Sequence, residues 1–177
     1  KGTVTVMVQA AGRTTRMLHT VEEGDYITDV VGPLGKATHI KNFGTVICAG
    51  GGVGVAPMLP IIQALKEAGN RVISVLAGRS KELIILEEEV RKSSDDVIIM
   101  TDDGSYGQKG MVTDPLKAAL ARGEKFDRVI TIGPLIMMKF VVATVKPYGI
   151  PTVVSMNPIM IDGTGMCGGC RLTVGGV

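Results

Sequence analysis

The chain has 177 residues, which is enough to bury one good core, or one domain and part of another. Its 19 basic and 17 acidic residues are scattered, and aromatic residues make up 3 %, so the basic stripe and stacking platform of nucleic-acid-binding proteins are both missing. No apolar stretch approaches the roughly 20 residues that a membrane span needs, and the start does not resemble a signal sequence. We therefore predict a cytoplasmic protein that binds no nucleic acid and has no membrane span.

The first 40 residues have the pattern of a β-rich domain. Residues 3–8 alternate like a strand, a short helix is expected after Arg13, and a second extended stretch leads from Tyr26 into Gly35. We predict a domain boundary within residues 36–44. Because the chain starts within a strand pattern and ends after a turn-like Gly175-Gly176 pair, we interpret it as a fragment of a longer protein.

From residue 45 onward, strand and helix patterns alternate as in a parallel, doubly wound α/β sheet. The apolar runs are rich in β-branched residues and continuous, which suits strands buried on both faces. Glu87 and Arg91 are spaced as an ion pair on a solvated helix face. The expected strands are 45–49, 71–77, 96–101, 128–132 and 151–155, and the expected helices are 56–68, 83–92, 112–121 and 136–148.

A glycine-rich turn lies between the first of these strands and the first helix. It contains Gly51, Gly52, Val53, Gly54, Val55, Ala56 and Pro57. Glycines let the backbone approach a ligand closely, and the unpaired N–H groups of a helix start attract a pyrophosphate. The turn is neither a Walker A loop nor the spaced Gly-x-Gly-x-x-Gly fingerprint, and taken alone it fits a simple tight turn equally well.

The loops after the other strands are also rich in glycine and polar residues, and in a parallel sheet they meet at one edge. They contain Arg79, then Asp102, Asp103, Gly104 and Ser105, then Gly133, Pro134 and Met137. The two aspartates are suited to ribose hydroxyls and would repel a 2′-phosphate, which favours NADH, whereas Arg79 and Lys81 favour NADPH. The alternatives are that Asp-Asp-Gly-Ser is an ordinary turn and that Met137 is a core residue.

Near the C-terminus, Asp162, Cys167 and Cys170 have the x₄ then x₂ spacing of a plant-type [2Fe–2S] loop, with aspartate in the first position. A fourth ligand is missing. The Cys-x-x-Cys pair alone also fits half a zinc site or a redox dithiol. Cys48 lies in an apolar strand and is expected in the core. With only two histidines, neither near a nucleophile motif, a triad hydrolase is excluded.

Five motifs in order resemble the ferredoxin–NADP reductase superfamily. The likeness is to electron-transfer subunits related to that of dihydroorotate dehydrogenase, and in particular to the small subunits of sulfide dehydrogenase and NADH-dependent ferredoxin:NADP oxidoreductase. The motifs are Gly32-Pro33-Leu34-Gly35, the turn at residues 51–57, Thr101-Asp102-Asp103-Gly104-Ser105, the stretch 133–138, and residues 162–171. They cover nearly the whole chain.

The resemblance implies three segments. Residues 1–40 would be the C-terminal part of a FAD-binding β-barrel, residues 41–156 a five-stranded NAD(P)-binding domain, and residues 157–177 the start of a [2Fe–2S] module. Residues 51–57 would hold the pyrophosphate, residues 102–105 the ribose, and Gly133 with Pro134 the nicotinamide. Thr15, Gly32, Pro33, Leu34 and Gly35 match flavin-side positions, and Asp162, Cys167 and Cys170 match three cluster ligands.

The resemblance also has departures. The family's Arg-x-Tyr-Ser/Thr flavin signature is absent from this chain, so we expect that the fragment alone holds no FAD and is inactive. Ile132 stands where the family often has a cysteine.

The function implied is electron transfer from NAD(P)H through FAD and a [2Fe–2S] cluster to a partner. The partner would be ferredoxin, or an oxidoreductase subunit of the glutamate synthase or dihydroorotate dehydrogenase type. The alternative is a non-catalytic module that senses NAD(P).

Overall fold

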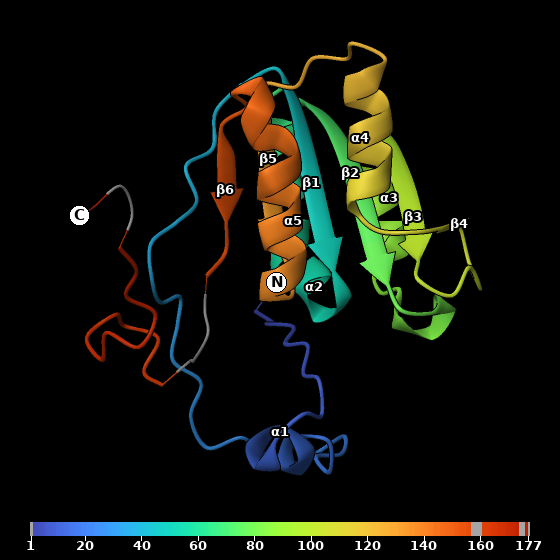
Figure 1. Cartoon of the computed structure of the whole chain (residues 1–177). Helices are drawn as coiled ribbons and strands as arrows, with labels where there is room; N and C mark the ends of the chain where they lie inside the picture. Colours follow the sequence, from blue (N-terminus) through green and yellow to red (C-terminus); the bar gives the residue numbers. More distant parts are fainter. Residues whose placement is uncertain (1, 157–160, 174–175, 177) are drawn as a thin grey trace. The chain divides into compact units, whose positions relative to one another are not determined.

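The computed structural model describes residues 2–156, 161–173 and 176 (Figure 1). The chain divides into two compact units. One, the sheet unit, is His39–Ser155, and the other, the flanking unit, combines Lys1–Thr38 with Met156–Val177.

The sheet unit is built on one parallel sheet in the order β4-β3-β2-β1-β5-β6. The predicted parallel α/β fold is confirmed, but the sheet has six strands and the expected five was one too few. The extra strand, β4, pairs Gln108 with Met100 and Lys109 with Thr101 of β3. The strands are β1 Thr45–Gly51, β2 Arg71–Gly78, β3 Asp96–Thr101, β4 Gln108–Lys109, β5 Arg128–Ile132 and β6 Thr152–Val154.

Helices cover both faces of this sheet (Figure 1). Successive strand residues point to opposite faces, so Val46 and Cys48 join the core that contains Met58 of α2, while Ile47 packs in the core that contains Val141 of α5. The helices are α2 Val55–Glu67, α3 Glu87–Ser93, α4 Thr113–Ala121 and α5 Leu135–Val145, with short 3₁₀ turns η1 Gly52–Gly54, η2 Lys81–Leu83 and η3 Lys146–Tyr148.

The helix predicted from residue 83 begins later. Residues 81–83 form η2, and Leu86 has a left-handed φ of +56° directly before α3. Ile84, Ile85 and Leu86 pack against the core from this irregular stretch. Their apolar side chains therefore reflect burial and not a helical stripe.

A polar clip joins the segment before β1 to the end of α2. The Asn70 side chain is buried, and its Nδ2 donates to the carbonyls of Leu65 at 2.8 Å and Lys41 at 2.9 Å. Its Oδ1 accepts from the N–H of Phe43 at 2.6 Å. At the start of β1, Asp127 Oδ2 accepts from the N–H of Thr45 at 2.7 Å. These bonds fix how the chain enters the sheet.

The flanking unit contains the short helix expected after Arg13, α1 Arg13–Leu18, which buries no residue. The strand expected at residues 3–8 was wrong, because these residues form no strand and Val4 is 81 % exposed. The predicted turn at Gly175-Gly176 lies partly outside the described residues. No helix in the described part of the chain has the length and apolar character needed to cross a bilayer.

Candidate functional site

The loops at the carboxyl edge of the sheet form the candidate nucleotide site. β1 lies between β2 and β5, so the helix after β2 and the helix after β5 cover opposite faces, and the chain changes direction at the end of β1 (Figure 1). Parallel sheets bind ligands at this kind of switch point. The glycine turn follows β1 directly, as η1 and then α2.

Three of the predicted glycines lie where the turns after β1 and β5 pack closely together. A Cβ on Gly51 would lie 2.5 Å from Met137 Sδ, and one on Gly54 would lie 2.5 Å from the Ile132 carbonyl oxygen. A Cβ on Gly133 would lie 3.1 Å from the Gly51 nitrogen. The turns after β1 and β5 therefore touch through their backbones. Met137 contacts this joint and also packs against the core, as its alternative interpretation predicted.

Gly52 has a different role. Its φ is +53°, and a Cβ there would meet no atom within 4 Å, so this part of the turn opens to free space. Val53 and Pro57 are exposed, Ala56 is half-buried, and Val55 is buried in the core.

The start of α2 beside this opening has no side-chain cap and no acidic residue in its first turn. The positive end of the helix dipole is therefore left for an anion.

The loops after β2 and β3 are hydrogen-bonded to one another. The N–H of Asp103 donates to the Arg79 carbonyl at 3.2 Å, and the N–H of Lys81 donates to Ser105 Oγ at 2.9 Å. Gly104 makes the turn with φ +77°. The sequence placed these residues along one edge, and the structure brings them into one connected surface.

Asp103 also shows the local turn chemistry that was the alternative to ribose binding. Its Oδ1 accepts from the N–H of Ser105 at 2.9 Å and from the Ser105 hydroxyl at 2.6 Å. That hydroxyl first, and then the N–H, hold the pKa of Asp103 below its ordinary value, so the loop carries a fixed negative charge. Asp102 is exposed beside it.

Tyr106 lies in the same loop as Asp103, within the candidate site, and was not among the residues predicted from the sequence. Its hydroxyl donates to Glu87 Oε1 at 3.0 Å, and Lys81 Nζ lies 5.3 Å from its ring centroid. The predicted Glu87–Arg91 pair is confirmed at 2.7 Å, so the Glu87 carboxylate accepts from both Arg91 and Tyr106. The hydrogen bond to Glu87 raises the pKa of Tyr106. A tyrosine in a strand-end loop, in a chain with few aromatic residues, was the available signal.

Within the flanking unit, Thr15 caps its own helix. Its Oγ1 accepts from the N–H groups of Ala11 at 3.0 Å and Gly12 at 2.8 Å. Gly32, Pro33, Leu34 and Gly35 are exposed. Leu34 approaches the C-terminal loop, since a Cβ on Gly163 would lie 3.1 Å from Leu34 Cδ1. A flavin role for these residues remains a prediction.

The loop of the predicted cluster ligands is organised by Asp162. Its Oδ1 accepts from the N–H groups of Thr164 at 2.9 Å and Gly165 at 3.3 Å, and its Oδ2 accepts from that of Cys167 at 3.0 Å. Desolvation, the largest single influence, raises the pKa of Asp162, but these backbone N–H groups together outweigh it and leave the pKa below its ordinary value.

The cysteines differ in setting. Cys167 is exposed, and its Sγ accepts from the N–H of Gly169 at 3.4 Å, while Cys170 is half-buried. Over the residues that the structure describes, no three His, Cys, Asp or Glu side chains are grouped to hold a metal. The donor types suit a [2Fe–2S] cluster, but the three side chains are not brought together, so the cluster remains a prediction from the resemblance. Cys48 is in the core as expected, and burial raises its pKa to about 12.

The fold and its carboxyl edge define the class of ferredoxin reductase-like NAD-binding domains. Residues 48–143 match the family model described as the oxidoreductase NAD-binding domain. The chain belongs to this family, and the resemblance seen in the sequence is confirmed.

Two curated relatives are similar along almost the whole chain. The electron transfer subunit homolog of dihydroorotate dehydrogenase B (NAD(+)) from Thermotoga maritima is 50 % identical over 176 residues, which cover 99 % of this chain and 62 % of the relative. A probable subunit of the same name from Methanocaldococcus jannaschii is 40 % identical over 164 residues, covering 92 % and 62 %. The chain thus spans less than two thirds of these relatives.

Solved structures agree with the fold. A structure of NADH-dependent reduced ferredoxin-NADP oxidoreductase, described in a study of flavin-based electron bifurcation, superimposes with a TM-score of 0.86 and 49 % identity over 96 % of this chain and 60 % of that one. The C-terminal domain of a hydrogenase from Pyrococcus furiosus has a TM-score of 0.58 and 27 % identity, over 70 % of this chain and all of that domain.

Proposed function

We propose that this chain is the nucleotide-binding part of an electron-transfer subunit of an NAD(P)H-dependent oxidoreductase. The observation that carries the proposal is the open position at Gly52 beside the uncapped start of α2, at the switch point of a sheet from the NAD-binding family. A phosphate group fits such a position, because the backbone can be approached closely and the positive end of the helix dipole has no side-chain cap.

Different residues of the chain bind different parts of the nucleotide. The turn at Gly52 and Val53 receives the pyrophosphate. The Asp102 and Asp103 carboxylates accept hydrogen bonds from the ribose and disfavour a 2′-phosphate, so NADH is preferred. The joint that contains Gly133 bounds the nicotinamide end and keeps it in register with the phosphate turn. When bound, the nucleotide supplies a hydride.

The proposal extends to the whole protein. There, FAD and a [2Fe–2S] cluster held by Asp162, Cys167, Cys170 and one further ligand carry the electrons to a partner oxidoreductase subunit or to ferredoxin. The names of the relatives, as electron transfer subunits, support a role in electron transfer with a partner. A location in the cytoplasm is part of the same proposal.

The test is calorimetric titration of the chain with NADH and with NADPH at one fixed ionic strength. A matched pair, Gly52→Asp and Gly52→Asn, separates charge from shape, because both residues tolerate a left-handed φ and differ mainly in charge. We expect Gly52→Asp to weaken NADH binding about tenfold more than Gly52→Asn, which corresponds to about 1.4 kcal/mol. If the unaltered chain binds neither nucleotide, or the two variants behave alike, the phosphate site is wrong.

Turnover separates the enzyme from the alternative of a sensing module. The whole protein, loaded with its cofactors, is expected to oxidise NADH in the presence of an electron acceptor. Nucleotide binding without any NADH oxidation would favour the sensor.

A further inference from the structure

Tyr106 anchors the loop that carries Asp102 and Asp103, through both its main chain and its side chain. The main chain is held by the buried Thr101 of β3, whose hydroxyl donates to the Tyr106 carbonyl at 2.6 Å and accepts from its N–H at 3.2 Å. The side chain leaves the loop and reaches α3, where its hydroxyl donates to Glu87 Oε1 at 3.0 Å. One residue therefore fastens the loop to a strand and to a helix.

The acceptor on α3 is itself held in place. The Glu87 side chain is only 22 % exposed, and its Oε1 also accepts from Arg91 Nε at 2.7 Å, one turn further along α3. The helix packs on the sheet through Val90, which is completely buried. A carboxylate ordered in this way offers the Tyr106 hydroxyl an acceptor in a defined position.

The anchored loop keeps acceptors that a ribose could use. Both hydrogen bonds from Ser105 go to Oδ1 of Asp103, which leaves Oδ2 to accept from a ligand. Asp102 is exposed, its N–H donates to the Gly78 carbonyl at 3.1 Å, and among the residues that the structure describes its carboxylate forms no ion pair. The position of these oxygens therefore depends on how firmly the loop is held.

We propose that Tyr106 is a positioning residue for the nucleotide, whose bond to Glu87 holds the carboxylates of Asp102 and Asp103 where they accept from the 2′-hydroxyl of the adenosine ribose. The inference rests on the proposed function, which assigns the ribose to these carboxylates. A hydrogen bond weakens steeply with poor distance or angle. A loop that has lost its anchor on α3 therefore loses the ribose bond, while the phosphate turn at Gly52 is unaffected.

Two ligands test this role, NADH and the same dinucleotide with 2′-deoxyadenosine in place of adenosine. Each is titrated calorimetrically into the chain at one fixed ionic strength. The unaltered chain is expected to bind NADH at least about tenfold more tightly, because only NADH has the hydroxyl that the carboxylates accept from.

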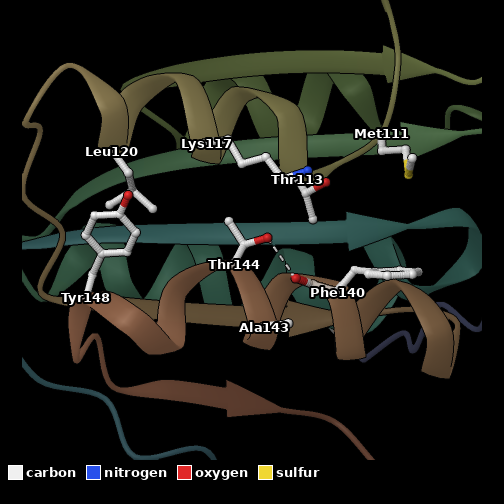
Figure 2. A pocket seen from close by; sticks show the side chains of 8 residues that line it. All are labelled: Met111, Thr113, Lys117, Leu120, Phe140, Ala143, Thr144 and Tyr148. Atoms are coloured by element: carbon white, nitrogen blue, oxygen red, sulfur yellow. Dashed lines mark hydrogen bonds between the residues drawn. The ribbon is translucent and has the colours of Figure 1, made fainter.

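Tyr106→Phe removes the hydroxyl but keeps the ring and its contact with Lys81. It is expected to lower the ratio of the two affinities at least about threefold and to change binding of the deoxy ligand less than about twofold. Tyr148→Phe is the matched control. Figure 2 shows Tyr148 near Leu120 in the pocket between α4 and α5, which cover the face of the sheet opposite α3, so this variant is expected to leave the ratio unchanged.

Variants of Glu87 test the link itself. Glu87→Gln keeps an acceptor oxygen and is expected to retain most of the ratio, whereas Glu87→Ala is expected to lower it as Tyr106→Phe does. The double variant Tyr106→Phe with Glu87→Ala is expected to lower it no further, because both changes remove the same bond. Cooperative thermal unfolding of each variant confirms that it is folded.

Three results would overturn the inference and leave the phosphate site standing. They are equal binding of the two ligands by the unaltered chain, an unchanged ratio in Tyr106→Phe, and fully additive losses in the double variant. Equal weakening of both ligands by Tyr106→Phe leaves the ratio unchanged, and would mean that Tyr106 serves only stability. Failure of the unaltered chain to bind either ligand would instead overturn the proposed function, and the inference with it.

Discussion

The sheet unit and the flanking unit contain similar apolar residues but use them differently. In the sheet unit, residues such as Val46 and Met58 are completely buried between sheet and helices. In the flanking unit, Val4, Val30 and Val31 are 81 %, 69 % and 75 % exposed, and local bonds such as that between His19 Nε2 and the Val8 carbonyl at 2.9 Å hold the chain. The difference shows that an apolar pattern becomes a buried element only where another element covers it.

The largest expected difference between the units is in the packing of methionine. Met58 is fully buried in α2, so Met58→Ala is expected to lower the free energy of unfolding by about 3 kcal/mol through lost contacts and a cavity. Met17 is 62 % exposed in α1, and Met17→Ala is expected to change it by less than about 0.5 kcal/mol. Urea unfolding followed by circular dichroism measures both. Equal losses would mean that the flanking unit shares the cooperative core.

A smaller loss of stability is expected when a side chain that bonds the backbone is removed, such as Asn70 in the sheet unit or Thr15 in the flanking unit. Asn70→Ala leaves the Phe43 N–H and the Lys41 carbonyl without the Asn70 side chain, while the Leu65 carbonyl keeps its bond from the backbone N–H of residue 70; the change is expected to cost about 2 kcal/mol of global stability. Thr15→Ala, which removes the cap of α1, is expected to loosen that helix alone. Amide hydrogen exchange distinguishes the two, since Asn70→Ala should speed exchange in β1 and Thr15→Ala should not. Faster exchange throughout the sheet after Thr15→Ala would contradict the separation.

The smallest effect concerns acid. Hydrogen bonds, first from the Lys66 side chain and then from the Val72 N–H, hold the pKa of Asp95 below its ordinary value of 3.8. A depressed pKa in the folded state adds stability that is fully present above the unfolded pKa and is lost as the pH falls through the folded pKa. Asp95→Asn is therefore expected to flatten the fall in sheet-unit stability below about pH 4. Unfolding midpoints measured across that range test this prediction. If their dependence on pH is the same in Asp95→Asn, Asp95 does not contribute to the loss of stability in acid.

Much of the sheet unit could be predicted from the sequence, because its signals are local. β3 and β5 have the predicted bounds, and β1 and β2 each extend by one or two residues at the carboxyl end. β4 could not be predicted in the same way. It has only two residues, Gln108 and Lys109, and both are exposed, so the sequence contains no apolar pattern that would mark a strand. The predicted strand at residues 3–8 failed for the opposite reason: the alternation is present, but in the described part of the chain no strand pairs with it.

The location of the candidate site could be predicted from the sequence, but the separate roles of its glycines could not. Strand ends placed Gly52, Asp103 and Gly133 along one edge. The sequence could not show that Gly51 and Gly133 serve packing while Gly52 faces open space, because this depends on which atoms of other strands approach each glycine. The link from Tyr106 to Glu87 joins a loop to a helix 19 residues away, and only tertiary structure reveals it.

The backbone joint between Gly51 and Gly133 has a mechanical consequence. With the ideal Cβ of Gly133 only 3.1 Å from the Gly51 nitrogen and 3.2 Å from its oxygen, the main chains of the two turns lie directly against each other, and Met137 packs beside both. A displacement of one main chain must push the other. We therefore expect the ends of β1 and β5 to move together, so that a change at one strand end is felt at the other.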